Sequence, residues 1–130
     1  MKVIRGLYAG IVRSISFFRK WYYLLFYNSL SNNRVILYGQ IKNSRIHIRG
    51  INNLVFIRKG SKLSNVKISI SGNNSKIFIS DDVVFREGGY IRIEGFHNQL
   101  VIGSKTNLVN VFFSIGDSDT SVFIGNNCLI

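Results

Sequence analysis

Hydrophobic and polar residues alternate along several short segments of the chain. Residues 45–48 (RIHI), 66–70 (VKISI) and 90–93 (YIRI) place an apolar side chain at every second position. A period of two residues predicts β-strands with one buried face. Isoleucine and valine suit such strands, because their branched side chains fit a pleated, half-buried surface.

The alternating segments return at a nearly constant interval, which defines a repeat. Two rows of apolar residues advance in steps of 22 or 23 positions. The first row is Val35, Ile57, Ile79, Ile102 and Ile124, and the second is Ile48, Ile70, Ile93 and Ile115. A fixed period of about 20–50 residues is the signature of stacked coils. We therefore predict an all-β fold, a single-chain parallel β-helix whose equivalent residues lie one above another, about 4.8 Å apart.

Polar turns separate the predicted strands. They contain glycine and mostly asparagine at residues 50–53 (GINN), 72–74 (GNN), 95–98 (GFHN) and 116–119 (GDSD). Glycine and asparagine accept the positive φ angles that sharp corners need. The chain has no proline, so every backbone N–H can join a hydrogen-bond ladder. A β-sandwich would also need such turns but not a fixed period, so the repeat favours the β-helix over residues 32–130, with about five coils.

Charge is distributed unevenly between the two parts of the chain. The net charge is +11, but residues 1–80 contain 14 Lys and Arg and no acid, whereas residues 81–130 contain three basic and six acidic residues. This asymmetry indicates an anionic partner near the N-terminal end. For residues 32–80, a solvated basic face that discourages edge pairing is an equally good interpretation. No nucleic-acid-binding motif is visible, so we expect no nucleic-acid partner.

The first part of the chain, residues 1–31, has a different pattern. Apolar residues return every three or four positions, which predicts an amphipathic α-helix. These residues are Ile4, Tyr8, Ile11, Ile15, Phe18, Tyr22 and Leu25. The uncharged run at residues 21–33 is too short to span a bilayer, which requires about 20 apolar residues. Charges interrupt the apolar stretch, and no cleavage pattern of a signal peptide follows it.

Cationic and aromatic residues together on this helix are typical of a membrane interface. The predicted interface residues are Lys2, Arg5, Arg13, Phe18, Arg19, Lys20, Trp21 and Tyr22. We expect peripheral attachment to an anionic membrane surface, on the cytoplasmic face of the cell membrane. The same helix could instead cover the open end of the first coil, because a terminal coil exposes strand edges and apolar side chains. The two roles are compatible.

Four segments of the repeat resemble the opening coils of bacterial hexapeptide-repeat acyltransferases, in particular the enzymes that modify capsular polysaccharide or lipopolysaccharide. The segments are residues 74–79 (NSKIFI), 91–95 (IRIEG), 100–103 (LVIG) and 122–128 (VFIGNNC). Ile-Gly at 102–103 and 124–125 matches the mark of that family, and the resemblance covers residues 32–130. It implies a left-handed β-helix. The interval of 22–23 residues exceeds three hexapeptides, about 18 residues, so a right-handed coil stays open.

The resemblance also implies an activity. Members of the family transfer an acyl group from acetyl-CoA or another acyl-CoA to a hydroxyl of a glycan acceptor. They work as homotrimers without a metal, and a histidine acts as general base. We therefore expect an acyl-CoA-dependent O-acyltransferase acting on a surface-polysaccharide or lipopolysaccharide precursor. The alternative is a non-catalytic, membrane-associated β-helix that scaffolds or binds an anionic glycan or lipid.

The two histidines do not lie in the catalytic context of that family. His47 alternates with two isoleucines, which predicts an outward, solvated side chain, and His97 replaces a polar corner residue. Asp81 and Asp82 are adjacent and would point to opposite faces of a strand, so we predict a corner rather than an acidic site. Cys128 is the only cysteine, which excludes an intrachain disulfide. Catalytic and coenzyme-binding residues therefore stay unassigned.

The last residues, 129–130, fall in the middle of a predicted coil without a polar cap. Because a solenoid needs a cap at each end, we expect the β-helix to be incomplete at its C-terminal end. We also expect the catalytic histidine to lie beyond it.

Overall fold

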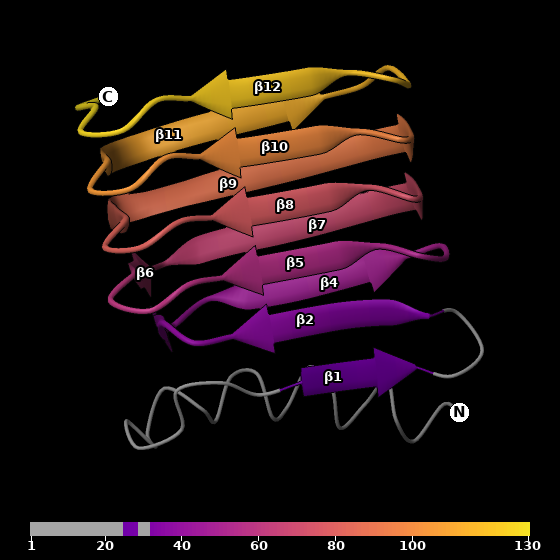
Figure 1. The fold of residues 1–130 in the computed structure, drawn as a ribbon, viewed down its shortest axis with the longest axis horizontal. Helices are drawn as coiled ribbons and strands as arrows, with labels where there is room; N and C mark the ends of the chain where they lie inside the picture. Colours follow the sequence, from indigo (N-terminus) through magenta and orange to yellow (C-terminus); the bar gives the residue numbers. More distant parts are fainter. Residues whose placement is uncertain (1–24, 29–31) are drawn as a thin grey trace.

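The repeat winds into a parallel β-solenoid in the computed structural model, which describes residues 25–28 and 32–130 (Figure 1). The strands are β1 (Leu25–Asn28), β2 (Asn33–Leu37), β3 (Gln40–Lys42), β4 (Arg45–Arg49), β5 (Leu54–Ile57), β6 (Lys62–Ser64), β7 (Val66–Asn73), β8 (Lys76–Ile79), β9 (Val84–Phe96), β10 (Gln99–Ile102), β11 (Asn107–Ile115) and β12 (Ser121–Ile124). The described part of the chain is all-β, as predicted.

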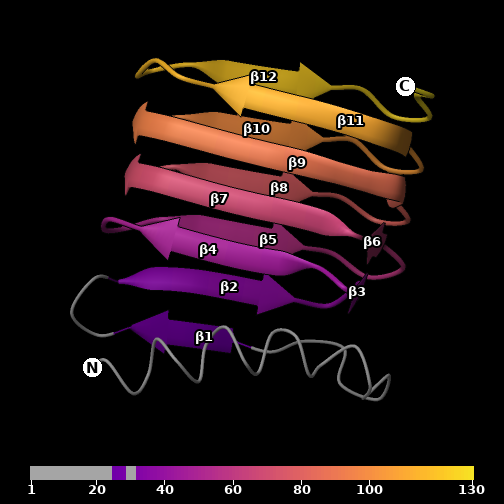
Figure 2. The same ribbon diagram turned by 180° about the vertical axis from the view of Figure 1, so that it is seen from behind.

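Two parallel sheets form the walls of the solenoid. The first sheet has the strand order β1-β2-β5-β8-β10-β12, and the second has the order β3-β6-β9-β7-β4, with β11 paired to β9. Figures 1 and 2 show the two sheets on opposite sides of a column that rises from the N-terminal to the C-terminal end. Each coil adds one strand to the first sheet and one or two to the second. The column contains about four turns.

The strand register confirms the second apolar row completely. Ile48 pairs with Ile70, Ile70 with Ile93, and Ile93 with Ile115. The 23-residue step in this row has a local cause. One extra residue in β9, near Glu87, forms a bulge where Glu87 and the following glycine both take positive φ angles.

The first apolar row is correct except for its first member. Ile57, Ile79, Ile102 and Ile124 pair in register, but the residue beneath Ile57 is Leu37 rather than Val35. The connection from β2 to β3 has only two residues, 38–39, whereas the connection from β5 to β6 has four, 58–61. The first coil is therefore shorter than the others. Because Val35 and Leu37 both face inward, their alternation alone could not distinguish the two registers.

Aliphatic side chains from every coil fill the space between the walls. Leu37, Ile57, Ile79 and Ile102 are fully buried in the first sheet, and Ile70 faces them from the second. Burial of one such side chain contributes about 1.5–3 kcal/mol. No coil can bury its inward isoleucines alone, so stability depends on stacking against neighbouring coils.

Residues with positive φ stack at each of the three corners of a coil. One corner uses Asn52, Asn74, His97 and Asp119, with φ between 56° and 59°. The second corner uses Asn43, Asn65, Glu87 and Asn110, and the third uses Gly60, Asp82, Lys105 and Asn127. The predicted glycine- and asparagine-containing turns are confirmed as corners.

The N-terminal segment meets the column through β1. Leu25–Asn28 pair antiparallel with β2, so the predicted helix over residues 1–31 is wrong for these four residues. The edge of β2 would otherwise leave its N–H and C=O groups unpaired, and a short strand satisfies them. The rest of that prediction, with all eight proposed membrane-interface residues, lies outside the described residues.

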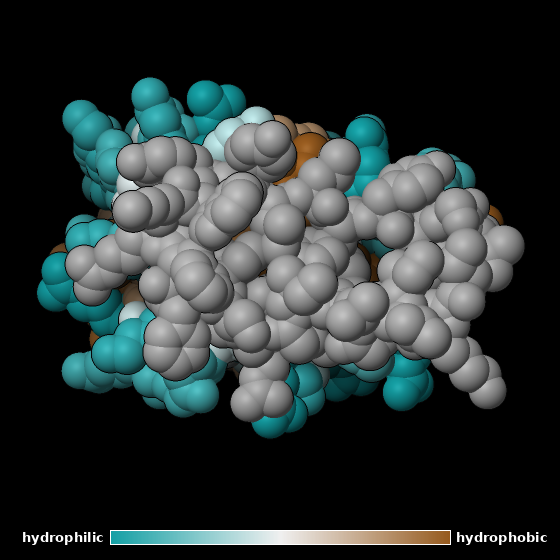
Figure 3. All heavy atoms as spheres, turned by 90° about the horizontal axis from the view of Figure 1, so that it is seen from below, coloured by the Kyte–Doolittle hydropathy of each residue, from teal (hydrophilic) through white to brown (hydrophobic). Residues whose placement is uncertain are grey.

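The described residues are visible mainly around the rim of this end of the molecule. Viewed from below, hydrophilic side chains project around the outside of the column (Figure 3). Among the described residues, no helix is long and apolar enough to cross a membrane.

Candidate functional site: a polar groove along one corner

A groove with a volume of about 500 Å³ follows the corner where the second sheet turns into the first. It crosses several coils, so equivalent residues of successive coils line it one after another. Its wall is the column of positive-φ residues Asn32, Asn52, Asn74 and His97, and its floor comes from the first residues of the adjoining strands. This arrangement presents repeated polar groups along a line.

Buried amides hold this corner in place from the inside. The Asn53 side chain is 1% exposed. Its Oδ1 accepts a hydrogen bond from the backbone N–H of Ser75 at 3.0 Å, and its Nδ2 donates to the carbonyl oxygen of Gly72 at 2.8 Å. Asn33 makes the two corresponding contacts one coil below. Asn98 Oδ1 likewise accepts a hydrogen bond from the Thr120 N–H, but its Nδ2 donates to the Glu94 carbonyl oxygen of its own coil. Because buried polar groups that lose their partners are costly, this network fixes the backbone that forms the groove.

The floor of the groove contains two cationic side chains. Strand register places Arg34, Leu54, Lys76 and Gln99 in one outward row. Arg34 and Lys76 are two coils apart, a separation of about 10 Å between strands. The two ion pairs of the described residues, Arg58–Asp81 and Arg92–Glu94, lie elsewhere. Arg34 and Lys76 therefore have no carboxylate partner within the described part of the chain.

Among residues 32–130, no acidic residue lines the groove. The nearest acid on the corner column is Asp119, which follows His97 in the next coil. The groove is therefore cationic over its N-terminal coils, and the first carboxylate of the corner column lies beyond them. Its amides can both donate and accept hydrogen bonds, whereas its two cations attract negative charge. Chemically, the arrangement fits a ligand with hydroxyl groups and at least one anionic group.

The structure places the two histidines in different settings. His47 is exposed in β4, as predicted, and its Nε2 accepts a hydrogen bond from Arg49 Nε at 3.1 Å. His97 lines the groove and has the same corner conformation as Asn52 and Asn74. Within residues 32–130, no carboxylate contacts either imidazole to orient it for proton transfer.

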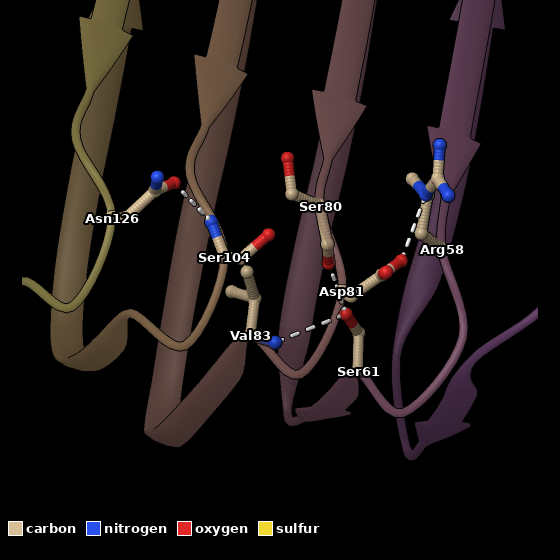
Figure 4. Close-up of polar contacts among 7 residues, drawn as sticks. All are labelled: Arg58, Ser61, Ser80, Asp81, Val83, Ser104 and Asn126. Atoms are coloured by element: carbon tan, nitrogen blue, oxygen red, sulfur yellow. Dashed lines mark hydrogen bonds and ion pairs between the residues drawn. The ribbon is translucent and has the colours of Figure 1, made fainter.

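The acidic residues behave as corner and surface residues. Asp81 Oδ1 accepts a hydrogen bond from Arg58 Nε at 2.8 Å, and Asp82 has a positive φ of 57°. Figure 4 shows the Arg58–Asp81 pair beside the hydroxyl of Ser61, which accepts a hydrogen bond from the Val83 N–H at 3.1 Å. These contacts tie adjacent coils together at the third corner, beside Gly60 and Asp82. They provide no catalytic pair.

One pKa shift occurs on the second sheet. The hydrogen bond and the negative charge of Glu94 raise the pKa of Arg92. Both side chains are about half exposed, so this pair is a surface contact that keeps Arg92 charged. It has no connection with the groove.

An apolar row on the outer face of the first sheet is a feature that the sequence analysis missed. Ile36, Phe56, Phe78, Val101 and Phe123 stack in register. The rings of Phe56 and Phe78 are 6.2 Å apart, and Phe123 is 65% exposed. The sequence did carry a sign of this row, because aromatic residues recur at outward strand positions with the same interval as the coils. We call these five residues the outer apolar row.

Together, these features define a parallel β-solenoid with a cationic, amide-lined groove along one corner. Comparisons of the chain with protein-family models, with curated proteins and with solved structures found no match.

Proposed function

We propose that the protein is an acyl-CoA-dependent O-acyltransferase that acts on a bacterial surface-polysaccharide or lipopolysaccharide precursor. In this reaction the acceptor hydroxyl oxygen attacks the thioester carbonyl carbon, and the carbon–sulfur bond breaks. A general base takes the hydroxyl proton, which then passes to the leaving thiolate. The groove supplies polar contacts suited to a glycan acceptor. Neither His47 nor His97 is assigned as the base, and the residues that hold the coenzyme stay unassigned.

The observation that supports this proposal most directly is the winding of the column. As the chain rises from its N-terminal to its C-terminal end, the near strands β5, β8 and β10 point to the left in Figure 1. The near strands β7 and β9 point to the left in Figure 2. A coil that runs leftward on its near side while ascending is left-handed.

Left-handed winding is uncommon, since crossovers between parallel strands are right-handed in about 98% of cases. The acyltransferase family that the sequence resembles shares this unusual hand. The Ile-Gly pairs at 102–103 and 124–125 both fall at the end of a first-sheet strand, where the chain turns a corner. Fold alone does not establish activity, so the proposal needs a direct assay.

The assay measures thiol release from acetyl-CoA by the product of the complete reading frame that contains this sequence. Oligosaccharides of bacterial surface glycans serve as acceptors. We expect thiol release that depends on the acceptor. His97→Asn, which introduces the residue found at this corner in three earlier coils, should retain thiol release, because His97 is not assigned as the base. If neither thiol release nor acetyl-CoA binding is detected, the proposal is wrong.

A homotrimer is part of this proposal, and the outer apolar row supports it. A row of side chains that includes the largely exposed Phe123 could pack against a neighbouring column. Sedimentation equilibrium would measure the mass of the assembly. We expect Phe78→Ser to weaken association, whereas Ser69→Ala on the outward face of the second sheet should not.

The second candidate function is a non-catalytic, membrane-associated solenoid that binds an anionic glycan or lipid. One observation favours it: the described residues bring together cationic and amide groups but no oriented base. Peripheral attachment to the inner face of the cell membrane, through residues 1–31, belongs to both candidates. Glycan binding without any acyl transfer by the complete reading frame would favour this second function.

A further inference from the structure

We infer that the corner groove binds a linear glycan that bears carboxylate groups, and that Arg34 and Lys76 each meet one of them. This inference rests on the proposed function, because it names the chemical class of the acceptor. Within the described part of the chain, two cations without a carboxylate partner and no acid line this site of about 500 Å³.

The spacing of the two cations suits a ligand with more than one anionic group. Arg34 and Lys76 occupy the same outward row with Leu54 between them. Two steps of strand spacing separate them by about 10 Å. Side chains that extend straight out from these two strand positions hold their charges about 10 Å apart, so an extended polymer with acidic groups at a similar interval can contact both. The partly exposed Leu54 lies between them and offers an apolar surface to a sugar ring.

The wall of the groove supplies partners for hydroxyl groups. Asn32 Nδ2 donates a hydrogen bond to Asn52 Oδ1 at 2.6 Å. Within the described part of the chain this leaves the Nδ2 of Asn52 free to donate to a ligand. Asn74 and Gln99 add amides in the following coils. Amide groups that both donate and accept hydrogen bonds match the alternating donors and acceptors of sugar hydroxyls.

Two other anionic ligands fit these observations less well. A phospholipid headgroup presents its charge at one point, and so leaves most of the amide row unused. A single-stranded nucleic acid would require aromatic side chains on which bases stack, and among the residues 32–130 that line the groove there is no Phe, Tyr or Trp. The regular repetition of polar groups from coil to coil instead matches a polymer with a regular repeat.

Binding of galacturonic acid oligomers, measured by isothermal titration calorimetry without any acyl donor, tests the inference. Glucose oligomers of equal length are the neutral control. Lys76→Gln and Arg34→Gln should each weaken binding about tenfold, the usual effect of losing one charge-assisted hydrogen bond. Lys42→Gln removes the same charge from an exposed site outside the groove, and should change affinity less than about twofold. All three side chains are exposed, so circular dichroism should show unchanged folding.

Several outcomes would overturn the inference. The first is that the neutral oligomers bind as tightly as the acidic ones. The second is that Lys42→Gln loses as much affinity as the two groove variants. The third is that phosphatidylglycerol vesicles or inorganic phosphate compete more strongly than the acidic oligomers. These outcomes are distinguishable from a failure of the proposed function. Tight binding that depends on Lys76, without thiol release, would contradict acyl transfer only. Acyl transfer to neutral and acidic acceptors at equal affinity would contradict the carboxylate site only.

Discussion

Gly72 lies directly beneath Gly95, and a Cβ atom added to Gly72 would overlap the carbonyl oxygen of Gly95. Gly72 also has a φ of 155°, at the limit of the region that other residues rarely adopt. Because both obstacles involve backbone atoms, no side-chain rotation relieves them. We expect Gly72→Ala to lower the free energy of unfolding by about 3 kcal/mol, which urea denaturation would measure.

Gly116 provides the matched control for this prediction. A Cβ atom added there meets no atom within 4 Å. Gly116→Ala should therefore change the free energy of unfolding by less than about 0.5 kcal/mol. A similar loss in both variants would show that the close stacking of glycines at this corner is not the cause.

Two neighbouring asparagines should differ sharply in their contribution to stability. Loss of the Asn53 side chain leaves the Ser75 N–H and the Gly72 carbonyl without their buried partner. We expect Asn53→Ala to destabilise the protein by about 2–4 kcal/mol. Asn52 is exposed with a φ of 56°. Asn52→Gly keeps that conformation accessible and should cost less than about 1 kcal/mol. Equal effects in thermal denaturation would contradict the role of the buried network.

Ser75 interrupts this network and offers a stabilising substitution. Among the described residues, its Oγ is a buried side-chain atom without a hydrogen-bond partner. An asparagine at position 75 could accept from the Asn98 N–H and donate to the Gly95 carbonyl, as Asn53 does one coil below. We expect Ser75→Asn to raise stability by about 1 kcal/mol. Ser75→Ala, which only removes the unsatisfied hydroxyl, should gain less. A lower melting temperature for Ser75→Asn would mean that the corner cannot accommodate the larger side chain.

The sequence predicted the fold where the repeat was regular. The row from Ile48 to Ile115 has isoleucine at every coil, and the register confirms all of its steps. The first coil was harder, because a shorter connection after β2 shifts its register by two residues. A shift of two preserves the inward and outward faces of a strand. The hydrophobic pattern therefore could not reveal that the predicted register of β2 was wrong by two residues.

The same shift concealed the groove. With Val35 beneath Ile57, Arg34 would lie beside Phe56 and away from the row of Lys76. The true register places Arg34 beside Leu54 and two coils from Lys76. The site thus depends on the alignment of Arg34 with Lys76, 42 positions further along the chain, and the length of one corner sets that alignment. His97 was assigned to the correct corner, but the surrounding amides were considered only as turn formers.

Membrane attachment through residues 1–31 can be tested by charge substitution without removing β1. Each basic residue near an anionic leaflet adds about 1 kcal/mol to binding. Replacement of Arg13, Arg19 and Lys20 by glutamine should therefore weaken binding to anionic liposomes on the order of 100-fold. A flotation assay measures the bound fraction across lipid concentrations.

The control replaces Lys42, Arg45 and Lys62 by glutamine. These side chains are exposed on the column, so the control lowers the net charge by the same amount as the first triple variant. If the N-terminal segment is the attachment site, only the first triple variant loses binding, because electrostatic attraction falls off within about 10 Å at moderate salt. Equal losses in both variants would assign binding to the overall charge of the protein. Unchanged binding in the first variant would exclude these three residues as the electrostatic anchor.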